Sequence, residues 1–139
     1  MPFVSEQKIR FDDVDGAGIV YYPHFFHLCH KTFEDFFDAE APLSYPALVR
    51  DRRLGFPTVA IRSEFNAPLA YGDVAMVELT VLSIGRSSVV FGYDIRRKRD
   101  GAHSFHAEIT TVLVDLDSVK SVPVEDELRS LFEKFLLSK

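Results

Sequence analysis

Apolar residues recur every three or four positions through residues 23–37, which is the spacing of one face of an amphipathic helix. Pro23 suits the first helical position, where an amide N–H would have no partner, so we expect the helix to begin there. The face predicted to be buried comprises Phe25, Leu28, Cys29, Thr32, Phe33, Phe36 and Phe37. The large, mostly phenylalanine side chains on this face indicate a helix at the centre of the core.

Alternation of apolar and polar residues predicts five strands. The first lies before the helix, and the others follow it, at residues 3–11, 58–65, 74–84, 88–97 and 104–115. The turns at residues 85–87 and 100–101 are short and contain glycine, so the strands that they join are antiparallel. Gly92, inside a predicted strand, indicates a bulge or a close approach of two backbones.

Two shorter helices are also expected. The first is a short helical turn at residues 45–52, in a segment rich in proline. The second begins at Pro123, with Glu125, Asp126 and Glu127 at its positive end. Its apolar stripe comprises Leu128, Leu131, Phe132, Phe135 and Leu136.

The order of strand, long helix, four-strand meander and short helix indicates an α+β fold in one domain, residues 1–139. A single long helix covers only one face of an antiparallel sheet, and the edges of the sheet need partners as well. We therefore expect a homodimer in which two copies join their sheets into one. Whether two dimers pair into a homotetramer is left open.

Composition narrows the classes of function. The 139-residue chain has a formal net charge of −5, which gives no support for nucleic-acid binding. Cys29 is the only cysteine, so no intramolecular disulfide can form, and its place on the apolar helix face predicts a buried thiol. The first residues lack a signal-peptide pattern, and no segment reaches membrane-spanning length. We therefore expect a cytoplasmic protein without integral membrane association.

The segment just before the long helix is acidic and contains glycine: Asp12, Asp13, Asp15, Gly16 and Gly18. Backbone N–H groups at a helix start have no partner within the helix, and the helix dipole makes that end positive. Such groups can stabilise an oxyanion, and a carboxylate beside them can act as a nucleophile or as a general base. The alternative is that the aspartates only shape a turn and favour the helix start.

The residues around this loop form the pattern F-x-D-x-D-x-x-G-x-V-x-Y-P, at Phe11, Asp13, Asp15, Gly18, Val20, Tyr22 and Pro23. The pattern resembles the hotdog-fold acyl-CoA thioesterases, and among them the 4-hydroxybenzoyl-CoA thioesterase-like family. The resemblance covers nearly the whole chain, because the order of strands and helices agrees as well. It implies a hotdog fold, in which a curled antiparallel five-stranded sheet wraps a long central helix, with active sites at the interface of a dimer.

The resemblance also implies roles for single residues. The family's catalytic carboxylate corresponds to Asp15, and the backbone N–H that polarises the thioester carbonyl corresponds to Tyr22, with Gly18 in the substrate-binding loop. Two positions differ from the family. Gly16 stands where many members have proline, and His30 stands where the hydroxybenzoyl enzymes have a carboxylate thought to read the ring hydroxyl. The second difference argues against specificity for the 4-hydroxybenzoyl group.

Coenzyme A carries a pyrophosphate and a 3′-phosphate, which require basic groups near the entrance of the site. Arg86 lies in a turn with Ser87 and Ser88, and related enzymes have basic residues that contact the nucleotide near the matching turn. We therefore predict that this turn binds the substrate. For most of the basic run at residues 96–99 we expect a solvated strand end instead.

Three histidines, at positions 24, 27 and 30, have a spacing that suggests metal ligands. Positions i and i+6 diverge around a helix, however, and no cysteine or acidic pair completes a tetrahedral site, so we expect no metal. We predict instead that His24 or His27 lies near the mouth of the active site and that His30 contacts the acyl group. Thr58 is a further candidate for a polar contact with the substrate.

These observations predict an acyl-CoA thioesterase that hydrolyses a small or medium acyl-CoA, aromatic ones included, to free acid and CoA. We expect no cofactor, since coenzyme A enters as part of the substrate. Two alternatives stand beside this prediction. One is a hotdog dehydratase or hydratase, which needs a histidine beside an acid. The other is a non-catalytic protein that binds acyl-CoA or an acyl-carrier protein, against which the intact Asp15 argues.

Overall fold

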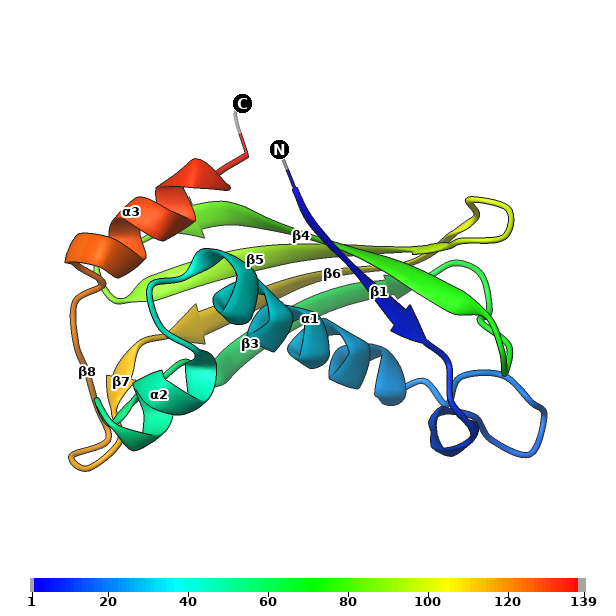
Figure 1. Cartoon of the computed structure of the whole chain (residues 1–139), viewed down its shortest axis with the longest axis horizontal. Coiled ribbons are helices and arrows are strands. Elements are labelled where there is room, and N and C mark those ends of the chain that lie inside the picture. Colours follow the sequence, from blue (N-terminus) through cyan, green and yellow to red (C-terminus); the bar gives the residue numbers. More distant parts are fainter. Residues whose placement is uncertain (1, 138–139) are drawn as a thin grey trace.

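The computed structural model describes residues 2–137 and contains one long helix, α1 (His24–Glu40), wrapped by a curled five-stranded sheet (Figure 1). The sheet is antiparallel, with the strand order β1-β4-β5-β6-β3. In that order its members are β1 (Phe3–Lys8), β4 (Val74–Ile84), β5 (Ser88–Arg97), β6 (His103–Val112) and β3 (Thr58–Phe65). The predicted α+β architecture is confirmed.

Helix α1 buries the face that the apolar repeat predicts. The buried residues of the helix are the seven of the predicted stripe. The ring of Phe33 lies 5.0 Å from that of Phe37 and 5.3 Å from that of Phe91 on β5, measured between ring centroids. Pro23 is the residue just before the helix, with φ −65°, so the start differs from the prediction by one position. Burying each such ring contributes about 1.5–3 kcal/mol to folding.

Strands β4 and β5 form the centre of the sheet. Alternate residues of β4 (Ala75, Val77, Leu79 and Val81) are fully buried. Gly92 of β5 pairs with Thr80 of β4, and a side-chain carbon at Gly92 would lie only 2.9 Å from the Thr80 hydroxyl oxygen. The pairing register shifts between Val81 and Ser83. The neighbours that require a glycine here are therefore side chains of β4, Thr80 and Leu82, and not the close backbone that the sequence led us to expect.

The first and last predicted strands are shorter than the sequence pattern indicated. Strand β1 ends at Lys8, and a 3₁₀ turn, η1 (Phe11–Asp13), follows because the Asp13 carboxylate accepts the backbone N–H of Arg10 at 2.8 Å. Strand β6 ends at Val112. Residues 114 and 115 instead form β7 (Val114–Asp115) of a small second sheet, between β2 (Leu54–Gly55) and β8 (Lys120–Ser121).

The final helix, α3 (Asp126–Lys134), begins three residues later than predicted. Val122 and Val124 donate their backbone N–H groups to Leu113 and Arg86, which keeps this segment extended. Phe135 and Leu136, expected to continue the apolar stripe, lie beyond the helix. The short helix α2 (Tyr45–Arg50) forms where it was expected. None of the described helices combines the length and the apolar character needed to cross a bilayer.

The two edges of the sheet differ in exposure. At one edge, all eight residues of β3 are exposed, and Val59 retains 61% of its surface. At the other edge, β1 is fastened to α1 through Asp35, whose carboxylate accepts hydrogen bonds from the Ser5 hydroxyl at 2.7 Å and the Gln7 amide at 2.8 Å. We call these two sides the β3 edge and the β1 edge.

Candidate active site

The loop between β1 and α1 holds its three aspartates differently. Asp13 is buried, and its carboxylate accepts the Arg10 N–H and lies 3.4 Å from Nδ1 of His24. Its backbone oxygen accepts the N–H of Tyr21 at 3.0 Å. Asp13 therefore holds the two ends of the loop together. Both oxygens of its carboxylate are engaged in the contacts with Arg10 and His24.

Asp15 lies at the exposed tip of this loop. Its carboxylate Oδ1 accepts the N–H of Ala17 at 2.9 Å, and its backbone oxygen accepts the N–H of Gly18 at 3.0 Å. Gly18 has φ +79°, a conformation that residues with a side chain rarely adopt. The Oδ2 atom of Asp15 accepts no hydrogen bond from any residue in the described range 2–137. The turn therefore presents a carboxylate with one oxygen available.

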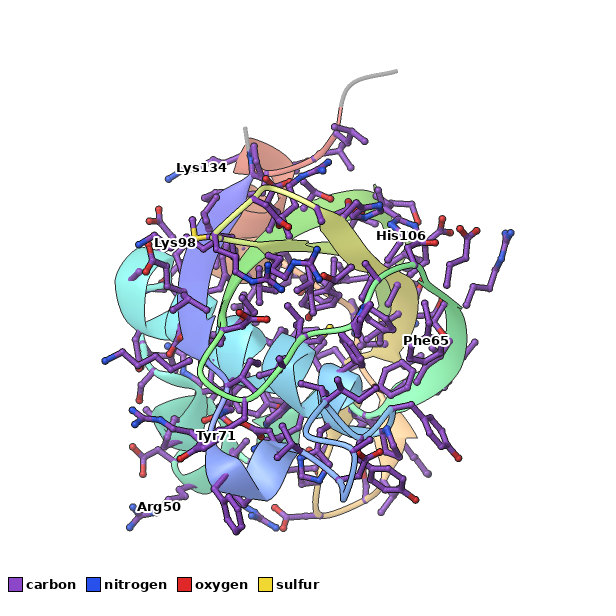
Figure 2. The ribbon with its side chains drawn as sticks, turned by 90° about the vertical axis from the view of Figure 1, so that its right-hand side faces the viewer. Arg50, Phe65, Tyr71, Lys98, His106 and Lys134 are labelled. Carbon is purple, nitrogen blue, oxygen red and sulfur yellow. The ribbon has the colours of Figure 1, made fainter. Side chains whose placement is uncertain are left out.

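The loop is docked on the segment that leads into β4. Val20 donates its N–H to Leu69 at 2.8 Å, and Gly18 accepts the N–H of Tyr71 at 3.0 Å. Figure 2 views the molecule from the end at which this loop lies, with Phe65 and Tyr71 labelled. Asp15 and the start of α1 are thus held at one defined end of the sheet.

The start of α1 leaves one backbone N–H available beside this loop. The N–H groups of His24, Phe25 and Phe26 are bonded to the oxygens of Tyr21, Tyr22 and Pro23, at 2.8, 3.2 and 3.1 Å. Pro23 has no N–H. The N–H of Tyr22 has no acceptor within the described part of the chain. A donor of this kind at the positive end of a helix suits an oxyanion.

A pocket lies between the start of α1 and the end of β3. We call it the helix-start groove, and it is lined by Ile19, Val20, Tyr22, Phe25, Phe65, Asn66, Ala67 and Pro68. The ring of Phe65 lies 6.2 Å from Tyr22, 5.6 Å from Phe25 and 6.4 Å from Phe26. Phe26 in turn lines a second cavity, farther along the helix. Phe26 and Phe65 therefore separate the two spaces.

The second cavity, which we call the aromatic cavity, is lined by five aromatic rings: Phe26, Phe33, Tyr45, Phe56 and Tyr93. Its wall also contains His30 and Thr58, both predicted to contact substrate. The Tyr45 hydroxyl accepts the N–H of Phe56 at 3.0 Å. Burial raises the pKa of Tyr45 and, more strongly, that of Cys29, which lines the cavity too, so both groups stay neutral.

The three histidines of α1 do not form a metal site. The rings of His24 and His27 lie 6.3 Å apart, whereas His30 Nε2 lies 2.6 Å from the Glu34 carboxylate. Within residues 2–137, no group of three or more His, Cys, Asp or Glu side chains is arranged to hold a metal ion.

The predicted nucleotide-binding turn lies at the other end of the sheet. Arg86 lies two residues beyond the end of β4, whereas the Asp15 loop is docked just before the first residue of that strand. Eleven residues of strand separate them, a span of about 35 Å. Arg86 is exposed, and its backbone oxygen accepts the N–H of Val124. Within one protomer, the structure does not bring Arg86, Ser87 and Ser88 to Asp15.

The basic run after β5 is engaged in ion pairs. Arg97 contacts Asp100 at 2.8 Å, Lys98 contacts Glu6 at 3.1 Å, and Arg99 contacts Asp73 at 2.9 Å. Pairing with Arg97 and with the Ala102 N–H lowers the pKa of Asp100 to about 2. These cations are neutralised by the chain itself, in agreement with the expectation that most of the run is a solvated strand end.

Sequence reasoning missed Glu34 and Tyr45 beside the predicted His30. The spacing of His30 and Glu34, four residues apart on a helix, was a readable signal for a side-chain pair. No sequence pattern indicated that Tyr45 lines the cavity, because only the tertiary fold brings α2 next to it.

Comparisons with known proteins agree with this geometry. The family model described as "Thioesterase-like superfamily" matches residues 9–132. A 1,4-dihydroxy-2-naphthoyl-CoA hydrolase of Synechocystis sp. is 27% identical over 122 residues, which make up 88% of each chain. The solved structure of a 1,4-dihydroxy-2-naphthoyl-CoA thioesterase from Synechocystis matches with a TM-score of 0.86 at 25% identity, covering 95% of this chain and 96% of that one. A thioesterase-superfamily structure from Jannaschia sp. matches with a TM-score of 0.89 at 25% identity, covering 99% and 94%.

The chain belongs to the thioesterase-like superfamily, and its fold is the hotdog fold. The resemblance seen in the sequence and the predicted class of enzyme, a thioester hydrolase, are thereby confirmed.

Proposed function

We propose that the protein hydrolyses aromatic acyl-CoA thioesters, with Asp15 as the catalytic carboxylate and the Tyr22 N–H as the oxyanion donor. The observation that carries this proposal is the placement of an available carboxylate oxygen and an unpaired N–H in one loop, at the positive end of α1. Removal of one such oxyanion donor can cost about 3–4 kcal/mol of transition-state stabilisation.

The chemistry requires attack on the thioester carbon and departure of the CoA thiolate. Either Asp15 attacks directly and forms a mixed anhydride that water then cleaves, or Asp15 takes a proton from the attacking water. In both routes the carbonyl oxygen becomes negative and is stabilised by the Tyr22 N–H. Both routes release a carboxylic acid and CoA, and both remain part of the proposal.

The aromatic cavity supports the choice of acyl group. Five aromatic rings line it, and flat apolar walls of this kind favour a planar aromatic ring through offset and edge contacts. The names of the Synechocystis relatives specify a bicyclic aromatic CoA thioester as their substrate. His30 and Thr58 in the cavity wall supply the polar contacts of the proposed acyl site. His24, beside Asp13, is proposed at its mouth.

A homodimer completes the proposed site. Thr58 of β3 pairs with Thr111, near the Arg86 turn, whereas Phe65 pairs with Phe105 and contacts Tyr22. Antiparallel pairing of β3 with its copy therefore brings the Arg86 end of one protomer to the Asp15 end of the other. In this arrangement Arg86, with Ser87 and Ser88, serves the partner's substrate by binding the phosphates of CoA.

The test is the release of thiol from a panel of CoA thioesters. The panel holds acetyl-, octanoyl-, benzoyl- and 2-naphthoyl-CoA, together with 3-hydroxyacyl- and enoyl-CoA. We expect release from the aromatic thioesters with the highest kcat/KM. Interconversion of the hydroxyacyl and enoyl thioesters would favour the dehydratase alternative. Saturable binding without any thiol release would reject hydrolysis and favour a binding protein.

A further inference from the structure

The part of β3 that can pair regularly with another strand is short. Its pairing with β6 is irregular between Thr58 and Ala60, and the strand ends at Phe65. Residues 60–65 therefore form the regular stretch, and all of them are exposed. The proposed homodimer uses this edge, but antiparallel pairing alone does not determine which residues of the two copies lie opposite each other.

The side chains of this stretch alternate between the two faces of the sheet. Ile61 lines the aromatic cavity, and Phe65 contacts Phe25 on α1, so the odd-numbered side chains face the helix. Arg62 and Glu64 therefore lie on the outer face. Neither of them forms an ion pair with any residue in the range 2–137 that the structure describes.

The alternation limits the possible registers of a symmetric pair. Residues that lie directly opposite each other share a face, so the two-fold axis must pass through a residue and not between two residues. An axis at residue 62 opposes residues 60–64 of the two copies, and an axis at residue 63 opposes residues 61–65. Every other axis opposes at most three residues of the regular stretch, so two registers remain.

The charges on the outer face distinguish these two registers. An axis at Arg62 places this arginine opposite the partner's Arg62 and leaves Glu64 opposite the partner's Ala60. An axis at Ser63 places Arg62 opposite the partner's Glu64 and, by symmetry, Glu64 opposite the partner's Arg62. Opposite charges across two strands are stabilising and like charges are destabilising, so the axis at Ser63 is favoured.

The register centred on residue 63 also continues a charge pattern that crosses the sheet. Glu64 lies opposite His106, and His106 lies opposite Asp94, whose carboxylate is 2.9 Å from the His106 Nδ1 atom. Beyond the edge, the partner's Arg62 comes next, and the partner's Glu108 lies opposite that arginine. Acidic and basic residues then alternate from one subunit into the other.

We propose that two copies pair along β3 with Ser63 on the two-fold axis, held in this register by two reciprocal ion pairs between Arg62 and the partner's Glu64. The proposal rests on the homodimer of the proposed function and assigns the register of its interface. On the inner face, the partner's Ile61 then lies opposite Phe65, a residue of the helix-start groove. Ile61 and Phe65 are 46% and 50% exposed in one protomer, and this contact buries both. The partner's Ile61 thereby completes the wall of the groove.

The first experiment determines the register by disulfide cross-linking. Arg62→Cys, Ser63→Cys and Glu64→Cys each place one thiol on β3, and the wild type is the control because Cys29 is buried. Directly opposed Cα atoms lie about 4.5–5.5 Å apart, within the range of a disulfide, whereas a shift by two residues increases this distance to about 8 Å. We expect Ser63→Cys alone to form a covalent dimer on mild oxidation, seen on a non-reducing gel.

A mixture of Arg62→Cys and Glu64→Cys chains should also cross-link, because the register opposes these two positions in a heterodimer. A covalent homodimer of Arg62→Cys or of Glu64→Cys would move the axis to that residue and overturn the proposal. Absence of cross-linking in every sample would reject pairing along β3. The cross-linked Ser63→Cys dimer should release thiol from benzoyl-CoA at the rate of its reduced form. Loss of this activity on oxidation, with the oxidised wild type still active, would show that the active dimer has another register.

The second experiment reverses the charges. Arg62→Glu and Glu64→Arg each turn two attractive pairs into two repulsive ones and should raise the dimer dissociation constant about tenfold. The double variant exchanges the two charges and should return to within about threefold of the wild type. Arg96→Glu, an equal reversal on the outer face of β5, is the matched control and should leave the constant unchanged. Sedimentation velocity with fluorescence detection measures all four variants.

Wild-type dissociation constants for both single variants would overturn the ion pairs, because an axis at residue 62 predicts that result. A double variant weaker than either single variant would overturn them as well. The gel and the sedimentation measurements use no substrate, so they separate the register from the proposed hydrolysis. Cross-linking of Ser63→Cys in a protein without thioesterase activity would reject the hydrolysis and keep the register. Hydrolysis by a wild type that sediments as a monomer would reject the register and keep the hydrolysis.

Discussion

The β1 edge and the β3 edge belong to one sheet and flank one helix, but they differ in whether nearby polar groups have hydrogen-bond partners within the protein. At the β1 edge, the Asp35 carboxylate accepts two side-chain hydrogen bonds, one of them from the buried Gln7. Along the β3 edge, a whole strand is exposed and the neighbouring Tyr22 N–H has no acceptor within the described residues. The hydrogen bonds of Asp35 stabilise the fold at the β1 edge, whereas we propose that a substrate and a partner bind at the β3 edge.

The largest expected effect comes from making the same substitution in the exposed loop before α1 and at the β1 edge. Asp15→Asn removes the proposed nucleophile or base and should lower kcat/KM by about 10²–10⁴-fold, with little change in stability, since Asp15 is exposed. Asp35→Asn weakens a carboxylate hydrogen-bond pair and should lower the free energy of unfolding by about 1–3 kcal/mol while kcat/KM stays within about twofold. Thiol release and urea unfolding measure the two effects. Asp15→Asn with wild-type activity would remove Asp15 from the mechanism.

The next effect concerns assembly. Val59→Lys places a charge on the exposed β3 edge and should raise the dimer dissociation constant at least about 100-fold, with a parallel loss of activity, because an unpaired charge is costly to bury. Val4→Lys makes the same change on β1, where Val4 is 43% exposed, and should leave both properties unchanged. Sedimentation velocity over a range of concentrations checks both variants. Equal effects of the two variants would show that the edges are equivalent.

A smaller effect is expected for the nucleotide end of the substrate. Arg86→Ala should raise the KM for an acyl-CoA about tenfold, through loss of a phosphate contact, and leave the KM for the matching pantetheine thioester unchanged. Arg99→Ala removes the same charge, but Arg99 is already paired with Asp73, so both KM values should stay at the wild-type level. A rise of equal size for both thioesters in Arg86→Ala would exclude a phosphate role.

The smallest effect is expected on the outer face of the sheet, away from both edges. Partial burial lowers the pKa of His106, but hydrogen bonds to Asp94 and Glu108 outweigh this and raise the pKa above 6.5. The stabilisation by the charged ring is therefore complete below about pH 6.5 and is lost as the pH rises through the folded-state pKa. His106→Gln should destabilise the protein more at pH 6 than at pH 8 in urea unfolding. A difference independent of pH would contradict the assignment.

Much of the fold was predictable because it depends on local periodicity. Strands β3, β4 and β5 and the buried face of α1 follow directly from two-residue and 3.6-residue repeats. The strands of the second sheet have only two residues each, which is too short for any repeat. The delayed start of α3 depends on backbone contacts with Leu113 and Arg86, which no local pattern records.

The site was predictable in part for a similar reason. Asp15, Gly18 and Tyr22 are neighbours in sequence, so one motif contains all three. The structure places Asp15 and Gly18 in one turn, and their role in catalysis stays a prediction. The sequence also predicts that Arg86 binds the substrate. Its distance from Asp15 depends on the strand topology, which a local motif does not record. The contribution of Tyr45 from α2 likewise required the folded chain.

The central claim, a site shared by two copies along the β3 edge, is tested most directly by subunit complementation. Asp15→Asn and Arg86→Ala chains with different tags are coexpressed, and the heterodimer is isolated and assayed with an aromatic acyl-CoA below KM. One of its two sites then combines a native Asp15 with a native Arg86 from the other chain, so we expect about half of the wild-type activity per dimer. A heterodimer no more active than the mean of its two parent homodimers would contradict the shared site.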